Sequence, residues 1–239
     1  MLQQSILGPT KLDSKLEDRS TLLLWIKASG VQKDLHRARI LHAISLGKGF
    51  FPQDVCINNA LLSLYFKCRA IKEAENLFEK INIRNVVSWT ALISGYVQSG
   101  LCDEALYGFK LMQSGGFSPN SVTFSCVLKA CSSKGALEIG EKIHSEIHNQ
   151  GLLQGNVVLG TSLLDMYANC HALGKAQEVF DNLPSRDVVS WNALISGYIQ
   201  HGHFDIALNC FQHMQDEGIS ANETTFSCIL KACGSMEYL

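Results

Sequence analysis

The chain has 239 residues, of which 46% are hydrophobic and 18% are charged, and its formal net charge at pH 7 is −2. This composition excludes an intrinsically disordered chain, because the apolar residues are numerous enough to offset the entropy lost on folding. No apolar run approaches the roughly 18 residues that a membrane-spanning helix needs, so no membrane partner is expected. The balanced charge also offers no broad basic field for nucleic acid, so any such binding must rest on specific contacts.

Residues 1–18 are expected to form an N-terminal lead-in to the first folded segment. They lack a basic stretch followed by an apolar stretch, which a secretory signal needs. They contain Asp13, Glu17 and Asp18, whereas organellar transit peptides are poor in acidic residues. No transit peptide is therefore visible in this part of the sequence.

Six successive segments then each contain two stretches with apolar residues at helical spacing. In residues 86–120, for example, Trp89, Ile93 and Tyr96 fall on one helical face and Gly100 ends that stretch. A helical hairpin of this kind cannot bury its apolar stripe alone, so neighbouring hairpins must stack on one another. The pattern predicts an all-α fold, and we expect a right-handed α-solenoid of stacked helix-turn-helix repeats.

The segments also repeat as a group of three. Val-Val-Ser-Trp at 86–89 returns at 188–191, and 21 of 35 positions are identical between 86–120 and 188–222. All such matches are offset by 102 residues, which is the sum of three segments of unequal length. The repeating unit is therefore a triplet.

The run Val-Val-Ser-Trp-Asn-Ala-Leu-Ile-Ser-Gly-Tyr at 188–198 and the Leu-Lys-Ala-Cys at 230–233 resemble plant pentatricopeptide repeats. The alternating lengths resemble the P-L-S subclass of that family. The resemblance implies the repeats L 19–54, S 55–85, P 86–120, L 121–156, S 157–187 and P 188–222. Residues 223–239 supply only the first helix of a seventh repeat, so we expect a fragment or a truncated array.

In this family each repeat recognises one RNA base. The resemblance implies that the fifth and last residues of a repeat, here called its recognition pair, face the base edge, while the second residue packs against the base. The recognition pairs are Asn59 with Asn85, Thr90 with Asn120, Thr161 with Asp187, and Asn192 with Asn222. The second residues are Cys56, Val87, Val158 and Val189, and the L repeat 121–156 offers weaker contacts through Ser125 and Asn156. The implied base preference, 5′ to 3′, is C-A-n-G-C.

The residues themselves support part of this assignment. Thr90 is replaced by Asn192 inside an otherwise constant Val-Val-Ser-Trp-x-Ala-Leu-Ile run, and the two side chains offer different donors and acceptors. The alternative is that these side chains only cap helix N-termini, where Asn and Thr are common. The sequence pattern alone leaves both interpretations open.

Catalytic and metal-binding motifs are incomplete. His144-Ser145-Glu146 matches half of a zinc deaminase signature, but the required Pro-Cys-x-x-Cys is absent. His144 and His148 have the spacing of two metal ligands without a third, so we expect no enzyme, no metal and no cofactor. Trp89 and Trp191 lie on apolar helix faces and are assigned to the core rather than to base stacking. The nine cysteines contain no Cys-x-x-Cys pair and are expected to be reduced and mostly buried.

Two classes of function remain. The first, implied by the resemblance, is sequence-specific binding of single-stranded RNA in mitochondrial or chloroplast RNA processing, above all C-to-U editing. Without a catalytic domain, the chain would need an editing deaminase or another editing factor in trans. The second is a protein-interaction scaffold like tetratricopeptide repeats, whose constant 34-residue period differs from the 35, 36 and 31 residues of these segments.

Overall fold

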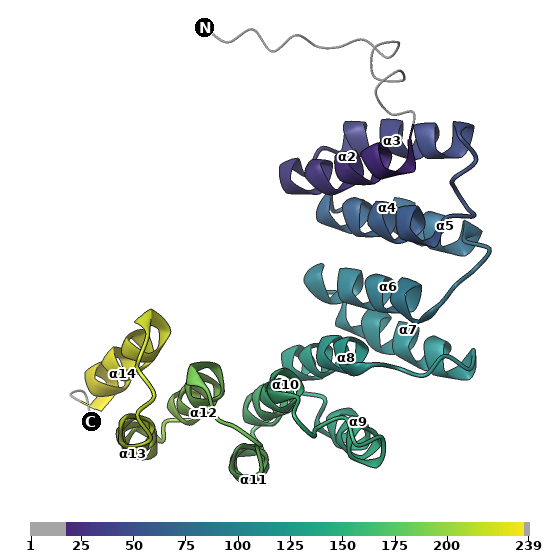
Figure 1. Cartoon of the computed structure of the whole chain (residues 1–239). Coiled ribbons are helices and arrows are strands. Elements are labelled where there is room, and N and C mark those ends of the chain that lie inside the picture. Colours follow the sequence, from purple (N-terminus) through teal and green to yellow (C-terminus); the bar gives the residue numbers. More distant parts are fainter. Residues whose placement is uncertain (1–17, 237–239) are drawn as a thin grey trace, which may run out of the picture. The chain divides into compact units, whose positions relative to one another are not determined.

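The computed structural model describes residues 18–236, and every regular element in that range is an α-helix (Figure 1). The rest of the expected lead-in and the last three residues lie outside the described range. Helices α2 to α7 are Arg19–Gln32, Leu35–Gly47, Val55–Lys67, Ile71–Lys80, Val86–Gln98 and Cys102–Ser114. Helices α8 to α14 are Ser121–Lys134, Leu137–Asn149, Val157–Asn169, Leu173–Asp181, Val188–Gln200, Phe204–Asp216 and Glu223–Met236. None of these helices is long and apolar enough to cross a membrane.

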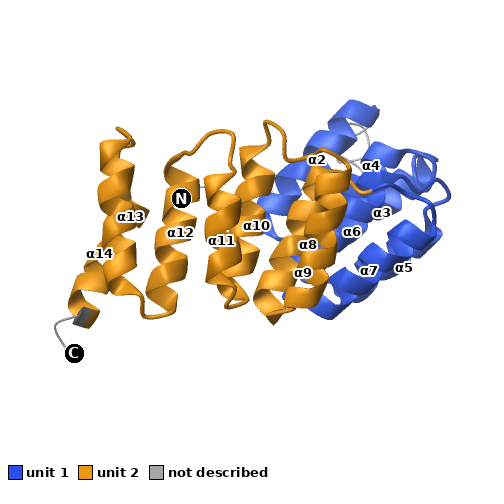
Figure 2. Ribbon diagram, turned by 90° about the horizontal axis from the view of Figure 1, so that it is seen from below, with its two compact units in different colours: residues 1–118 blue, residues 119–239 orange. Residues whose placement is uncertain are grey.

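The chain divides into two compact units, residues 1–118 and 119–239, which Figure 2 colours separately. In the first unit α2, α4 and α6 pack against one another in succession, and each also packs against the helix that follows it. In the second unit α8, α10, α12 and α14 form the same succession, with α9, α11 and α13 beside them. This stacking of helical hairpins confirms the expected all-α repeat solenoid. Its handedness stays a prediction.

The apolar faces identified in the sequence form the core of each unit. Trp89 and Trp191 are 7% and 4% exposed and pack edge-on against Phe78 and Phe180, with ring centroids 4.8 and 4.6 Å apart. Their assignment to the core is therefore confirmed. Helix α6 ends at Gln98, and Gly100 follows with a φ of +77°, a conformation that glycine adopts without strain.

The expectation for the cysteines was wrong in part. All nine are free thiols, but only Cys131, Cys170 and Cys210 are buried, and Cys56 and Cys233 are exposed. Cys56 is exposed because it lies at the N-terminal end of α4, just outside the helix's packed face. Local apolar composition therefore does not decide whether a thiol lies in the core.

Glycine allows the first helices of neighbouring repeats to approach closely. A Cβ atom added to Gly95 of α6 would lie 2.1 Å from the ring of Phe66 on α4. At the position 102 residues later, a Cβ on Gly197 of α12 would lie 2.8 Å from the Cβ of Ala168 on α10. Gly95 and Gly197 are at equivalent positions in their repeats, but only Gly95 has a bulky aromatic ring as its neighbour.

Ion pairs link the second helices of neighbouring repeats. Arg39 of α3 pairs with Glu73 of α5 at 2.6 Å, and Glu141 of α9 pairs with Lys175 of α11. The two pairs lie 102 residues apart in sequence and their charges are reversed. The two helices are therefore joined by an ion pair in both units, but the positive and negative side chains have exchanged places.

Candidate nucleic-acid interface

The last residue of each expected repeat is the N-cap of the helix that follows it. The side-chain oxygen of Asn85, for instance, accepts a hydrogen bond from the Ser88 amide at 3.0 Å, and that of Asn222 accepts from the Thr225 amide at 3.0 Å. The capping side chains that begin α4, α6, α8, α10, α12 and α14 are Asp54, Asn85, Asn120, Asn156, Asp187 and Asn222. These last residues therefore do cap helices, and they lie in a row at the N-terminal ends of the first helices within each unit.

The fifth residues occupy a different position, at the start of the second turn of the helix. The hydroxyl of Thr90 donates to the Val86 carbonyl at 2.7 Å, and that of Thr161 donates to the Val157 carbonyl at 2.9 Å. Both threonines are nearly buried, with 8% and 7% of their surface exposed. They are not N-caps. Within the second unit, Asp187 and Asn222 are exposed whereas their fifth-residue partners Thr161 and Asn192 are buried.

Asn192 and Asn222 are joined by a closed network of hydrogen bonds. The Nδ2 group of Asn192 donates to Oδ1 of Asn222 at 3.1 Å. The buried hydroxyl of Thr225 lies 2.7 Å from Oδ1 of Asn192 and 3.1 Å from Oδ1 of Asn222. Because Asn192 is only 8% exposed, these contacts satisfy polar atoms that the helix packing removes from water.

Asn59 and Asn85 form the same residue pair without this network. Oδ1 of Asn59 is buried and has no hydrogen-bond partner within residues 18–236. The nearby Ser88 hydroxyl donates to Oδ1 of Asn85 at 3.2 Å. A buried carbonyl oxygen without a partner is costly, so this pair is less tightly held than Asn192 and Asn222.

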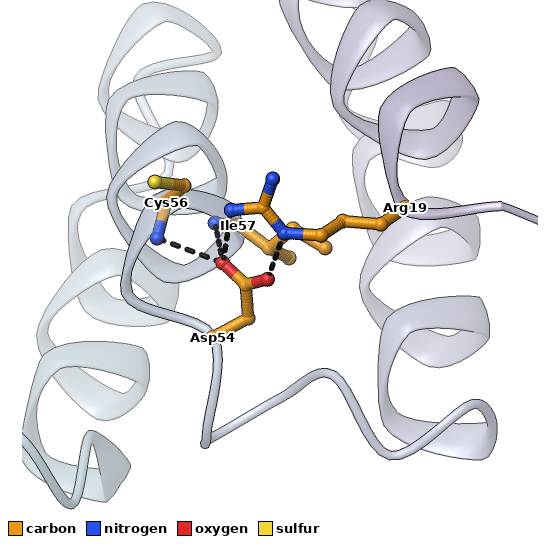
Figure 3. A network of polar contacts seen from close by, with 4 residues as sticks. All are labelled: Arg19, Asp54, Cys56 and Ile57. Atoms are coloured by element: carbon orange, nitrogen blue, oxygen red, sulfur yellow. Dashed lines mark hydrogen bonds and ion pairs between the residues drawn. The ribbon is translucent and has the colours of Figure 1, made fainter.

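Two aspartates hold equivalent capping positions, but their carboxylates have different partners. Asp54 accepts from the amides of Cys56 and Ile57 at 2.9 and 3.1 Å and also pairs with Arg19 through both carboxylate oxygens (Figure 3). The hydrogen bond from Arg19 holds the pKa of the Asp54 carboxyl below its usual value. Both of its carboxylate oxygens are engaged within the protein, which makes Asp54 less available to a base than Asp187.

The carboxylate of Asp187 is engaged on one side only. Its Oδ1 accepts from the amides of Val189 and Ser190 at 3.0 and 2.8 Å. In the part of the chain that the structure describes, Oδ2 has no hydrogen-bond partner and the residue is exposed. This oxygen is therefore available to accept a hydrogen bond from a base.

The second residues are apolar side chains left in solvent at the same helix ends. Val87, Val158 and Val189 are 55%, 74% and 58% exposed, and Cys56 is exposed as well. Val122, the second residue of the L repeat 121–156, is equally open at 61%. Small apolar groups in this place suit contact with the flat face of a base.

The two weaker residues of the L repeat make different contacts. The Ser125 hydroxyl accepts a hydrogen bond from the Ser162 hydroxyl of α10 at 3.2 Å. Asn156 caps α10 by accepting from the Leu159 amide at 3.1 Å. Ser125 therefore forms a contact between the first helices of two repeats, whereas Asn156 caps the start of a helix.

The sequence interpretation missed the third residue of each following helix. Asn85, Asn120, Asp187 and Asn222 are followed, three positions later, by Ser88, Thr123, Ser190 and Thr225, all of them fully buried. Their hydroxyls contact the capping residue or its backbone. A capping residue followed by a hydroxyl at this spacing is the signature of a capping box, and that signal could have identified them.

His144 has a structural partner. Its Nδ1 lies 2.9 Å from the Tyr167 hydroxyl, and 102 residues earlier His42 makes the same contact with Tyr65 at 2.9 Å. Burial lowers the pKa of both histidines and raises the pKa of Tyr65 and Tyr167 to about 12. Within residues 18–236 no three His, Cys, Asp or Glu side chains are grouped so as to hold a metal ion.

Comparison with family models matches this repeated architecture. The model of the PPR repeat family matches residues 84–133 and 186–235, and the PPR repeat model matches residues 59–86 and 122–152. Together they cover more than half of the chain. The chain belongs to the pentatricopeptide repeat family.

Plant relatives of this pentatricopeptide repeat protein are similar over most of its length. In Arabidopsis thaliana, the pentatricopeptide repeat-containing protein At4g30700 is 36% identical over 90% of this chain and 26% of its own length. Two others, the mitochondrial At1g06140 and the chloroplastic At4g18520, are 35% and 34% identical over 90% and 94% of this chain. The chain thus spans only about a quarter to two fifths of these relatives, since the matches cover 26%, 38% and 36% of their lengths.

A solved structure shares the fold. The crystal structure of the pentatricopeptide repeat protein PPR10 in complex with an 18-nt psaJ RNA element superposes with a TM-score of 0.73 at 18% identity. The match covers 94% of this chain and 34% of PPR10. PPR10 from maize, crystallised separately, gives a TM-score of 0.60 at the same identity.

Proposed function

We propose that this chain binds single-stranded RNA sequence-specifically, one base per repeat, as the target-recognition part of organellar RNA processing. The observation that carries the proposal is the row of capping side chains at the first-helix N-termini, where Asn222 and Asp187 are exposed and offer different hydrogen-bonding groups. The PPR10 structure supports an RNA ligand, because its solenoid has the same fold and was crystallised with RNA. The relatives named mitochondrial or chloroplastic support one of those organelles as the site of action.

The finer assignment follows the repeat lengths. The repeats are L 19–54, S 55–85, P 86–120, L 121–156, S 157–187 and P 188–222, which is the P-L-S arrangement. C-to-U editing is the processing step that we favour for such an array. The chain would then select the site, and a deaminase acting in trans would supply the chemistry.

The available donors and acceptors support the choice of base at two repeats. The free Oδ2 of Asp187 can only accept, which suits guanine, whose Watson–Crick edge presents N1–H and an amino group. Asn222 uses Oδ1 in its cap, so its Nδ2 group is the part left to contact a base. That donor suits N3 of cytosine and opposes N3–H of uracil. We assign G to repeat 157–187 and C to repeat 188–222.

The substitution Thr90→Asn tests the assignment most simply, because it copies residue 192 into the equivalent repeat. It should leave the free energy of unfolding nearly unchanged and shift the preference of repeat 86–120 from A toward C. One good hydrogen-bonded contact discriminates by about 1–3 kcal/mol, which is roughly fivefold or more in affinity. Titration of both proteins with RNA carrying A or C at that position measures the shift.

An unchanged A:C ratio would show that Thr90 does not influence base choice. The salt dependence of the same titrations separates RNA recognition from a protein-binding scaffold, because contacts with phosphates give a linear loss of log affinity with log salt concentration. A chain that binds none of the oligonucleotides would contradict the proposal itself.

A further inference from the structure

We infer that Thr225 is a positioning residue that sets the base preference of repeat 188–222 by fixing the orientation of two amides. This inference rests on the proposed function. Thr225 belongs to α14, outside the repeat whose recognition pair it contacts, and its side chain is fully buried. Its hydroxyl acts through Asn192 and Asn222 rather than on the base itself.

The backbone fixes the amide of Asn222. The amide N–H of Thr225 donates to the side chain of Asn222 at 3.0 Å, so the atom facing it must be the oxygen Oδ1. The amide of Asn192 lies 3.1 Å from this same oxygen and must therefore present its Nδ2 group there. One backbone donor thus determines the orientation of both side chains.

The hydroxyl of Thr225 completes this arrangement. It accepts a hydrogen bond from the backbone amide of Asn222 at 3.1 Å, which leaves its single proton to donate. The shorter of its two acceptor contacts is Oδ1 of Asn192, at 2.7 Å. Without the hydroxyl, Oδ1 of Asn192 would be buried without a partner, and rotation of the side chain toward solvent would become favourable.

A rotated Asn192 would weaken discrimination between cytosine and uracil. In the closed network Asn222 presents only its Nδ2 donor to the base, which favours N3 of cytosine. Once the hydrogen bond from Asn192 to Oδ1 of Asn222 is broken, the side-chain amide of Asn192 is free to turn toward the base. It can then present either its oxygen or its nitrogen. Such a pair can satisfy the acceptor of cytosine or the donor of uracil.

The chain contains a natural comparison. Asn59 and Asn85 have the same identities as Asn192 and Asn222, but the third residue of the following helix is Ser88, whose hydroxyl contacts Asn85 and not Asn59 in the described structure. Oδ1 of Asn59 has no partner among the residues of the described chain. The inference therefore predicts that repeat 55–85 distinguishes C from U less well than repeat 188–222 does.

The experiment uses the full chain and flanked RNA oligonucleotides that carry C or U at the position of repeat 188–222. A second series carries G or A at the position of repeat 157–187. Wild type should prefer C to U by about fivefold or more. In Thr225→Val the C:U ratio should approach one while the G:A ratio is unchanged, and Thr225→Ser, which keeps the hydroxyl, should retain the wild-type ratio.

Ser190→Ala is the matched control. Ser190 has the same position in α12, but among the residues that the structure describes its hydroxyl bonds only to the backbone of Asp187, accepting from the amide at 3.0 Å and donating to the carbonyl at 2.9 Å. Its loss should weaken the cap and leave both base ratios as in wild type. A purely structural role of Thr225 would make the two variants behave alike.

A wild-type C:U ratio in folded Thr225→Val would overturn the inference. If that variant does not fold, the C:U ratios of the two Asn–Asn repeats in the wild-type chain decide, and equal ratios would overturn it. Failure of the proposed function looks different, because the wild-type chain would then bind none of these RNAs.

Discussion

The pair Asn59 and Asn85 in the first unit and the pair Asn192 and Asn222 in the second have identical side chains at the same places in a repeat. Their surroundings differ. The second pair is closed by a direct hydrogen bond of 3.1 Å and by Thr225, whereas the first leaves a buried carbonyl oxygen without a partner in the described structure. The identities of the two recognition residues therefore do not by themselves determine which hydrogen-bonding groups a repeat presents to a base. A buried hydroxyl from the next helix contributes as well.

The same lesson holds for packing between segments 102 residues apart. The segments share helix ends, tryptophans and glycines, but the neighbours of those residues differ. Gly95 faces the ring of Phe66, whereas Gly197 faces the methyl group of Ala168. Positions that repeat within the chain thus differ in how closely they are packed in the two units.

The largest effect is expected for Gly95→Ala. The new methyl group would overlap the buried ring of Phe66, and overpacking of this kind costs about 1–3 kcal/mol. Both variants gain about 1 kcal/mol in helix propensity, and in Gly197→Ala, where the overlap is with one methyl group, this gain offsets a larger part of the cost. Urea denaturation of both variants measures the difference, and equal losses of unfolding free energy would contradict this account of the two approaches.

A second, smaller difference is expected between the two Asn–Asn pairs in the absence of RNA. Asn192→Leu removes two hydrogen bonds and should lower the free energy of unfolding by about 1 kcal/mol. Asn59→Leu removes a buried oxygen that has no partner, so it should be neutral or stabilising. The same denaturation experiment compares them, and a larger loss in Asn59→Leu would show that the first pair is satisfied in solution.

The smallest effect concerns the reversed ion pairs. Arg39→Glu places a second carboxylate beside Glu73 and should cost at most about 1 kcal/mol, because Arg39 is exposed, Glu73 is partly exposed, and solvent and salt screen the pair. Adding Glu73→Lys should restore stability, since the double variant copies the charges of Glu141 and Lys175. No recovery in the double variant at low salt would mean that the attraction across this position is negligible.

The fold followed from the sequence because its signals are local. The spacing of Trp89, Ile93 and Tyr96 and the glycine after the helix act within one segment, and the 102-residue period repeats them. The closed network did not follow, because Thr225 and Asn192 are 33 residues apart and their contact depends on helix stacking. The burial of individual cysteines and the partners of Arg39 and Asp54 depend on neighbouring helices in the same way.

Selection from a pool of randomised RNA oligonucleotides tests the central claim most directly, namely that consecutive repeats recognise consecutive bases through their capping side chains. The bound RNAs are sequenced, and each position is compared with the starting pool. We expect enrichment of C-A-n-G-C, with the strongest discrimination of C from U at the position of repeat 188–222. A bound pool without positional preference, or one with a purine at that position, would contradict the account.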